Sequence, residues 1–302
     1  MAKLTVIVHT KNSAAILDRC LKSVKPLSDE LLVVDMASTD NTRQIARSYG
    51  AKIIKHPDVG YVEPARNQAI KQASGDWILI IDDDEEISPD LSKHIKEVIT
   101  GSISADAIAL PRKNLIFGRW AKTGWWPDHQ IRLFRSGTVD WPPSLHAQPI
   151  VRGEVQYMPS QTSWAIIHYN YDDLDDFIDR AQRYSQIAVN ESKENQSKQE
   201  LGSQNLIDVF FREYLRRWYA KNGYQEGDYG QTLSAMQAFF EMLVLAKKWE
   251  KINFNNQNYS SNKLSIQLKE FAKEARWWEY QIKINQNKSW QKWYWKLRRK
   301  LG

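Results

Sequence analysis

The sequence predicts an α/β fold followed by a helical region. Up to about residue 110, short aliphatic runs alternate with segments that begin with helix-capping residues. Such alternation is typical of βαβ units and a parallel sheet. From about residue 171, hydrophobic residues recur at helical spacing. The 302 residues can bury a full core, and the single cysteine, Cys20, excludes an internal disulfide and is typical of a reducing compartment.

The first part of the chain is expected to contain four strands and four helices in alternation. The run Ile78-Leu79-Ile80-Ile81 is the clearest buried strand, and Ser88-Pro89-Asp90 is a good start for the helix after it. We expect strands at 4–9, 31–35, 51–55 and 77–81, and helices at 12–24, 38–49, 63–73 and 89–100.

The pattern changes after about residue 105. Short strands are expected at 107–111, 130–134, 151–157 and 163–168, joined by loops rich in Gly, Pro and Trp. Helices are expected at 174–194, 206–219, 233–249, 264–281 and 290–301, with Asn- and Ser-rich linkers at 195–205 and 253–262. We therefore predict a catalytic domain at 1–170 and a helical region at 171–302.

No segment predicts a membrane span or a leader. The longest apolar stretch, 233–246, is interrupted by Ser234, Gln237 and Glu241 and is too short to cross a bilayer. Met1-Ala2-Lys3 leads into a strand and not into a signal peptide. We expect a cytoplasmic protein that is soluble or peripheral on the inner face of the membrane.

Five carboxylates, Asp82 to Glu86, directly follow the strand at 78–81. Because neighbouring carboxylates repel one another, a cation would stabilise them, and oxygen ligands suit Mg²⁺ or Mn²⁺. In an extended strand tip, Asp82 and Asp84 would point to the same side. The alternative is a solvated acidic start of the next helix, which is a common arrangement.

Several blocks of the first half occur together in a characteristic order and spacing. They are His9-Thr10-Lys11-Asn12, Val33-Val34-Asp35 with Ser38-Thr39-Asp40-Asn41-Thr42, Ala65-Arg66-Asn67-Gln68-Ala69, Ser74-Gly75-Asp76-Trp77 and Asp82-Asp83-Asp84-Glu85. In these blocks the chain resembles family 2 glycosyltransferases, which have the GT-A fold, the Rossmann-like fold of nucleotide-diphospho-sugar transferases. The segment 124–135, with His168-Tyr169, resembles a small bacterial branch that includes lipopolysaccharide core glucosyltransferases.

The resemblance implies an activity. A hexose would pass from a nucleotide-sugar, with UDP-sugar favoured, to a saccharide or lipid-linked acceptor with inversion, in cell-envelope or polysaccharide synthesis. Mg²⁺ or Mn²⁺ would offset the charge of the departing diphosphate. By resemblance, Asp84 ligates the metal, Asp82 contacts the ribose or the metal, and Asp83 is a bystander. His168 would complete the metal shell, although a histidine beside an apolar run is often a core residue.

The resemblance also implies a donor-binding set. Thr10, Asn12 and Asp35 would hold the base or ribose, and Arg66 would pair with the diphosphate or with an acidic strand tip. Each has a structural alternative. The side chains of Thr10, Asn12 and Asp35 could serve as caps of nearby helices without binding the donor, and Arg66 could be a surface residue.

Inversion by single displacement needs one general base, and we expect it to be Asp128. Trp125 and Trp126, which precede it, would pack a sugar face, and Gln130 and Arg132 would line the acceptor or diphosphate side. Many family members carry a Glu-Asp pair followed by Gln-x-x-Arg-Trp, whereas this chain has Pro127-Asp128-His129 and Gln130-x-Arg132. Asp128 is therefore assigned on reach and residue type. The alternative for Arg132 is packing on a tryptophan.

The last segment, 288–302, is basic and rich in tryptophan. Trp290, Trp293, Tyr294, Leu297 and Leu301 recur at helical spacing, which is typical of a helix that docks on an anionic membrane. The alternative is a helix packed on the protein body with a solvated basic face. No nucleic-acid recognition motif accompanies these residues, so we expect no nucleic-acid partner.

Two other functions share some of these features. A sugar nucleotidyltransferase would be expected to carry a Gly-rich, basic loop after the first strand. Residues 9–13 occupy that position here and contain no glycine, so they lack this loop. An inactive saccharide- or membrane-binding protein would not need Asp82, Asp84 and Asp128 together.

Overall fold

A computed structural model of the chain describes residues 2–101, 103–145, 147–191, 206–254, 261–287 and 290–301. Two compact units make up the chain, Met1–Ile178 and Asp179–Gly302, and each is described by itself. The linkers expected at 195–205 and 253–262 fall largely outside the described residues, as does Lys288. Across the parts of the chain that the structure describes, none of the helices combines the length and apolar character that a bilayer span requires.

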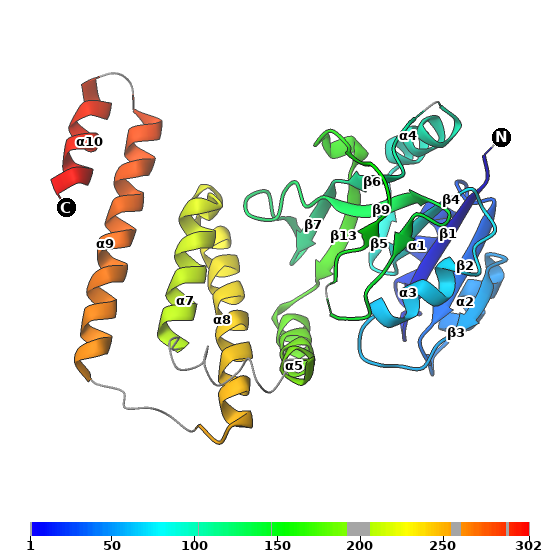
Figure 1. Cartoon of the computed structure of the whole chain (residues 1–302), viewed down its shortest axis with the longest axis horizontal. Helices are drawn as coiled ribbons and strands as arrows, with labels where there is room; N and C mark the ends of the chain where they lie inside the picture. The colour runs from blue at the N-terminus through cyan, green and yellow to red at the C-terminus, as the bar shows by residue number, and fades with distance from the viewer. Residues whose placement is uncertain are drawn as a thin grey trace. The chain divides into compact units, whose positions relative to one another are not determined.

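A seven-stranded sheet forms the centre of the first unit (Figure 1). Its strand order is β12-β6-β9-β4-β1-β2-β3. The strands are β1 (Leu4–Thr10), β2 (Glu30–Asp35), β3 (Lys52–Lys55), β4 (Trp77–Asp82), β6 (Ala107–Leu110), β9 (Gln130–Arg135) and β12 (Val155–Tyr157). As expected, β1 to β4 run parallel, but β9 is antiparallel to both β4 and β6, so the whole sheet is mixed.

Four helices connect the parallel strands. They are α1 (Leu17–Val24), α2 (Thr42–Ser48), α3 (Glu63–Ile70) and α4 (Pro89–Thr100). Ser88 caps α4, because its hydroxyl accepts the Leu91 N–H at 3.1 Å, as the sequence predicts. Helix α1 begins later than expected, since the Ser13 and Asn12 side chains are engaged elsewhere in the site.

The central strands β1, β2 and β4 are buried on both faces, as strands of parallel sheets are. Alternate residues of β1 point to opposite sides, so that Leu4 and Val6 pack in one core cluster with Leu17 of α1, while Ile7 packs in the other with Ala65 of α3. Gly75 lies where the chain crosses the start of β1. A Cβ there would stand 2.7 Å from the Thr5 amide nitrogen, so only glycine fits.

A second, four-stranded sheet was not anticipated from the sequence. Its order is β5-β13-β7-β8, and its strands are β5 (Glu85–Ile87), β13 (Ile166–Tyr171), β7 (Arg112–Ile116) and β8 (Arg119–Trp120). Strand β13 starts later than expected, after a short 3₁₀ turn at Thr162–Trp164. In the register of this sheet, His168 pairs with Glu85 on one side and with Asn114 on the other.

The strand expected at 151–157 is interrupted. Gly153, with φ of +126°, separates β11 (Ile150–Val151) from β12, and β11 pairs with β10 (Val139–Asp140). A residue with a side chain strongly disfavours that backbone conformation, so the glycine ends the strand.

The second unit is helical. Helix α5 (Leu174–Glu191) spans the boundary between the units, and α7 (Leu206–Leu215), α8 (Gly227–Lys251), α9 (Ser261–Gln286) and α10 (Trp290–Leu301) follow. Each helix expected here is therefore present. Helix α7 continues into a π-turn at Arg216–Ala220. The Phe211 and Phe271 rings stack at 5.0 Å between α7 and α9.

Candidate active site

Asp82 ends β4 at the carboxyl edge of the central sheet, between two buried arginines. Arg66 of α3 contacts Oδ1 through Nη2 at 3.2 Å, and Arg132 of β9 contacts Oδ2 through Nη2 at 2.6 Å. Burial alone would raise the pKa of the Asp82 carboxyl, but Arg132 and Arg66 outweigh it and hold the pKa well below its usual range. His9, beside them on β1, is neutral, because burial, followed by Arg66, lowers its pKa to about 3.

Residues 83 and 84 form a turn between β4 and β5. The expectation of an extended acidic tip is therefore wrong. The Asp82 carboxylate meets arginines, whereas Asp84 Oδ2 lies 3.5 Å from His168 Nε2. The physical reason is that Glu85 belongs to the second sheet, where β5 pairs with β13, and the chain must turn to enter it. Asp83 accepts a hydrogen bond from the Ser13 hydroxyl, and burial, followed by the charge of Asp84, raises its pKa to about 7.

Asp84 and His168 form a pair whose chemistry fits a divalent cation. The other ring nitrogen of His168, Nδ1, lies 2.6 Å from Asn114 Oδ1, an arrangement that orients the ring as protein metal sites do. Among the described residues, no group of three or more His, Cys, Asp or Glu side chains is arranged so that it could hold a metal ion. Two protein ligands suit Mg²⁺ or Mn²⁺, which commonly take further oxygens from substrate phosphates and water.

Asp128, the expected base, lies just before β9, and four side-chain nitrogens contact its carboxylate. Arg112 Nη2 and Nε lie 2.7 and 2.8 Å from Oδ2, Asn114 Nδ2 lies 3.0 Å from the same oxygen, and Gln130 Nε2 donates to Oδ1 at 2.7 Å. Burial would raise the pKa of Asp128, but Arg112 and the hydrogen bonds bring it below its ordinary value. The carboxylate is therefore ionised, as a base must be, and is a weaker proton acceptor than a free aspartate.

Glu85 links the ion pairs around Asp82 to those around Asp128. It is fully buried, and its Oε1 contacts Arg132 at 2.9 Å and Arg112 at 3.2 Å. Its Oε2 accepts the backbone N–H of Asp82 at 3.0 Å. A continuous series of ion pairs thus runs from Asp128 to Asp82.

Sequence reasoning missed Glu85, Arg112 and Asn114 as site residues. Glu85 stands within the acidic run, which was a usable signal. Arg112 and Asn114 stand in a strand without any motif, and only the pairing of β7 with β13 places them at the site.

The expected donor-side residues lie at the ends of β1 and β2. Asp35 Oδ1 accepts the Ser38 N–H at 3.1 Å, and its Oδ2 lies 3.1 Å from Arg43 Nε. Asn12 Oδ1 accepts the Thr39 N–H at 2.8 Å. Thr10 is buried and pairs with Asp35 in the sheet register. Asp35 and Asn12 therefore stabilise the loop after β2 and do not cap α2, whose N-cap is Asn41; their donor-binding roles stay predictions.

The expected acceptor-side residues lie around Asp128. The Trp125 carbonyl accepts a hydrogen bond from Asn114 at 3.1 Å, and the Trp126 ring meets Trp120 edge-on at 5.5 Å. Arg132 pairs with Asp82 and Glu85, so it is an ion-pairing residue. At this site Arg66 lies over a tryptophan, 4.3 Å from the Trp141 ring centre.

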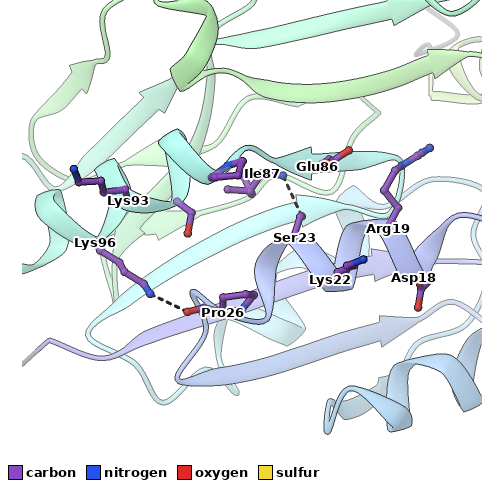
Figure 2. Close-up of a pocket in the computed structure, with 11 residues that line it drawn as sticks. Asp18, Arg19, Lys22, Ser23, Pro26, Glu86, Ile87, Lys93 and Lys96 are labelled. Atoms are coloured by element: carbon purple, nitrogen blue, oxygen red, sulfur yellow. Dashed lines mark hydrogen bonds between the residues drawn. The ribbon is translucent and has the colours of Figure 1, made fainter.

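A separate cavity of about 770 Å³ lies between α1 and α4 (Figure 2). Its lining includes Arg19, Lys22, Lys93 and Lys96, but none of the expected site residues. Lys96 donates to the Pro26 carbonyl at 2.9 Å, and Lys93 points away from Arg19 and Lys22. The cations do not converge, so this cavity is not a built anion site.

The mixed sheet, with its acids and arginines at the carboxyl edge of the parallel strands, defines a GT-A domain, and helices follow it in the chain. Residues 5–145 match the family model described as Glycosyl transferase family 2. The chain therefore carries a family 2 glycosyltransferase domain, and the resemblance predicted from its motifs is confirmed.

Curated relatives agree. The chain is 39% identical over 119 residues to an uncharacterised glycosyltransferase of Rickettsia prowazekii, which is 39% of this chain and 40% of that protein. The chain thus spans about two fifths of the length of the first relatives it matches. It is 22% identical over 263 residues to a lipopolysaccharide core biosynthesis glycosyltransferase of Rhizobium meliloti, which covers 82% of this chain and 92% of that protein.

The chain is also similar to two solved structures. Glucosyl-3-phosphoglycerate synthase of Mycobacterium tuberculosis, in complex with Mn²⁺ and uridine diphosphate, is 24% identical over 37% of this chain and 43% of that one, with a TM-score of 0.30. TarS of S. aureus is 17% identical over 78% of this chain and 54% of that one, with a TM-score of 0.44.

Proposed function

We propose that this protein is an inverting glycosyltransferase. It transfers a hexose from a nucleotide-sugar, a UDP-sugar by preference, to a saccharide or lipid-linked acceptor in cell-envelope or polysaccharide synthesis. The observation that carries the proposal is one connected site at the sheet edge. There, His168 and the carboxylate of Asp128 both contact the same buried amide, Asn114, and His168 pairs with Asp84 on its other side.

The donor side must stabilise a departing diphosphate. Asp84 and His168 would hold Mg²⁺ or Mn²⁺, which supplies charge neutralisation when bound. Arg66 and Arg132 are each only 4% exposed, and in the described part of the chain their Nε and Nη1 groups have no hydrogen-bond partner. Buried, unsatisfied donors are costly, and phosphate oxygens would satisfy them with charge-assisted bonds.

The acceptor side needs a proton acceptor and a surface for a sugar. Asp128 would accept the proton of the acceptor hydroxyl through its carboxylate, and Arg112 keeps that carboxylate ionised. Trp125 and Trp126 would pack against the sugar face. In this proposal, Gln130 orients Asp128 from its other oxygen.

The test is a thermal-shift screen of nucleotide-sugars with and without Mn²⁺, followed by an assay of the released product. Glycosyl transfer releases a nucleoside diphosphate, whereas a sugar nucleotidyltransferase would release pyrophosphate. We expect a metal-dependent shift with one donor, and loss of turnover in Asp84→Asn and Asp128→Asn. Full turnover by Asp84→Asn, or pyrophosphate release, would reject the proposal. Donor binding without turnover would favour a binding protein.

We also propose that helix α10 docks the protein on the anionic inner face of a membrane. One face of α10 packs on α9: Trp295 stacks on Tyr280 at 5.9 Å, and Arg299 lies over Trp277 at 5.2 Å. One face of α10 is therefore packed on the protein body, and membrane docking is proposed for the exposed face.

The exposed face combines apolar and cationic side chains. Trp293 is 69% exposed, and Tyr294 and Leu297 are each 42% exposed. Residues 290–301 contain no acid and five cations, Lys292, Lys296, Arg298, Arg299 and Lys300. Aromatic residues beside lysines on one helix are suited to the interface of an anionic bilayer.

A further inference from the structure

Asn114 is a buried polar residue to which no sequence motif assigns a role. It lies in the middle of β7, is 1% exposed, and pairs in register with His168 of β13. A buried amide on a strand must have hydrogen-bond partners, because an unsatisfied one is costly. Its partners decide what Asn114 does.

Those partners determine the orientation of the amide. Asn114 Nδ2 lies 3.0 Å from Asp128 Oδ2 and 3.1 Å from the Trp125 carbonyl. An ionised carboxylate and a carbonyl can only accept hydrogen bonds, so the NH₂ group must face them. The amide oxygen must then face His168.

The orientation of the amide in turn determines which nitrogen of His168 carries hydrogen. Asn114 Oδ1 lies 2.6 Å from Nδ1, and an amide oxygen can only accept, so Nδ1 carries the hydrogen. In the neutral ring, Nε2 then presents its lone pair toward Asp84 Oδ2, which is 3.5 Å away. This is the form of histidine that binds a metal.

The same amide also holds the loop that carries Asp128. One NH₂ group donates to both Trp125 and Asp128, so a single rigid group lies between the candidate proton acceptor and the candidate metal ligand. In a single displacement, the proton acceptor and the bound metal must act on the same pair of reactants. The rate therefore depends on their relative position, and small errors in that position slow the reaction strongly.

We propose that Asn114 is the positioning residue that links the metal side of the site to the base side. Its oxygen selects the metal-binding tautomer of His168, and its nitrogen orients Asp128. This inference rests on the proposed function, because it takes Asp84 and His168 as metal ligands and Asp128 as the base.

The experiment measures Mn²⁺ binding and needs no turnover. Mn²⁺ is titrated into the full chain, with and without UDP, and followed by electron paramagnetic resonance. Asn114→Leu keeps the branched shape of the side chain but removes both hydrogen-bonding groups, and we expect a loss of about 10- to 100-fold in Mn²⁺ affinity. Asn114→Asp keeps an oxygen for His168 but turns an oxygen instead of an NH₂ group toward Asp128 and the Trp125 carbonyl, so we expect it to retain more Mn²⁺ affinity than Asn114→Leu.

Gln130→Leu is the matched control. Gln130 supports Asp128 from the other oxygen at 2.7 Å and belongs to β9, not to the β7–β13 pair. We expect unchanged Mn²⁺ affinity in this variant. Thermal unfolding without metal checks that each variant is folded, and Asn114→Ala, which also removes the oxygen that faces His168, supplies the test if Asn114→Leu does not fold.

A double-mutant cycle with His168→Ala identifies the route of the effect. If Asn114 acts through His168, Asn114→Leu will cause no further loss in the His168→Ala background. The inference is overturned if Asn114→Leu binds Mn²⁺ like the wild type, if its loss persists without His168, or if Asn114→Asp loses affinity equally. Should Asp84→Asn also bind Mn²⁺ normally, the proposed metal site itself fails. If only the Asn114 variants behave normally, the proposed function stands and this inference alone is rejected.

Discussion

Replacing Glu85 by glutamine removes one charge from the centre of the site without changing its volume. Three acids, Asp82, Glu85 and Asp128, face three arginines, Arg66, Arg112 and Arg132, so this group of ion pairs is balanced. The Glu85→Gln variant leaves one excess positive charge in a buried environment. It also directs an NH₂ group toward either an arginine or the Asp82 N–H, both of which are donors.

The expected cost follows from these contacts. Breaking a buried ion pair from one side costs about 3–5 kcal/mol. Arg112 keeps Asp128 at 2.7 Å and Arg132 keeps Asp82 at 2.6 Å, so the low end of that range applies. A misdirected buried donor adds about 1 kcal/mol. We therefore expect a loss of about 4 kcal/mol in the free energy of unfolding of the first unit.

The assay is urea unfolding of the full chain, with hydrogen exchange of peptides from β4 and β9 to identify the first unit and of α8 to represent the second. The control is Glu86→Gln at the neighbouring position. Glu86 is partly exposed and accepts one hydrogen bond, from the Tyr169 hydroxyl at 2.9 Å, so we expect a loss of about 1 kcal/mol or less. A Glu85→Gln variant no less stable than Glu86→Gln would refute the argument that Glu85 is the electrostatic centre of the site.

Three further predictions concern the base, the sheet and the last helix. Replacing Arg112 by methionine removes the cation that lowers the pKa of Asp128, so the pKa of Asp128 rises. As the medium is acidified, kcat/KM should therefore start to fall at a higher pH than in the wild type. An unshifted acid limb of the pH–rate profile would show that Asp128 is not the base. Gly75→Ala places a Cβ 2.7 Å from the Thr5 amide nitrogen and 2.8 Å from the Lys3 carbonyl oxygen, which are both backbone atoms. We expect a loss of about 1–3 kcal/mol in the free energy of unfolding, measured with urea. Wild-type stability would mean that the backbone there moves freely. Vesicles containing phosphatidylglycerol should sediment the protein, and vesicles of phosphatidylcholine should sediment less of it. The double variant Trp293→Ser, Leu297→Ser should reduce sedimentation several-fold, whereas the control Leu268→Ser on α9, at a residue that is 45% exposed, should not. Equal sedimentation by both lipids would reject docking on an anionic membrane.

Local patterns predicted the four parallel strands correctly. The strands β1 to β4 are runs of aliphatic residues, and their burial on both faces of a parallel sheet follows directly from that pattern. The C-terminal helices were predicted equally well, because helical periodicity is a property of neighbouring residues. The second sheet was missed, since β5 begins with two glutamates and resembles a loop.

The same distinction holds for the site. The acidic run, His168 and Asp128 could be singled out by residue type and motif, and their roles remain predictions for the experiments above. Asn114 and His168 are 54 residues apart, and Glu85 and Arg132 are 47 apart. No local rule connects residues at such separations.

By itself, the amino-acid sequence determined where the four parallel strands and the helices form, and it placed carboxylates at the end of the fourth parallel strand. Only the tertiary structure decided that Asp82 faces arginines while Asp84 faces His168, because the pairing of β5 and β7 with β13 sets that choice. Hydrophobic periodicity acts over a few neighbouring residues. Ion pairs and amide orientations in a buried site depend on which distant strands lie side by side.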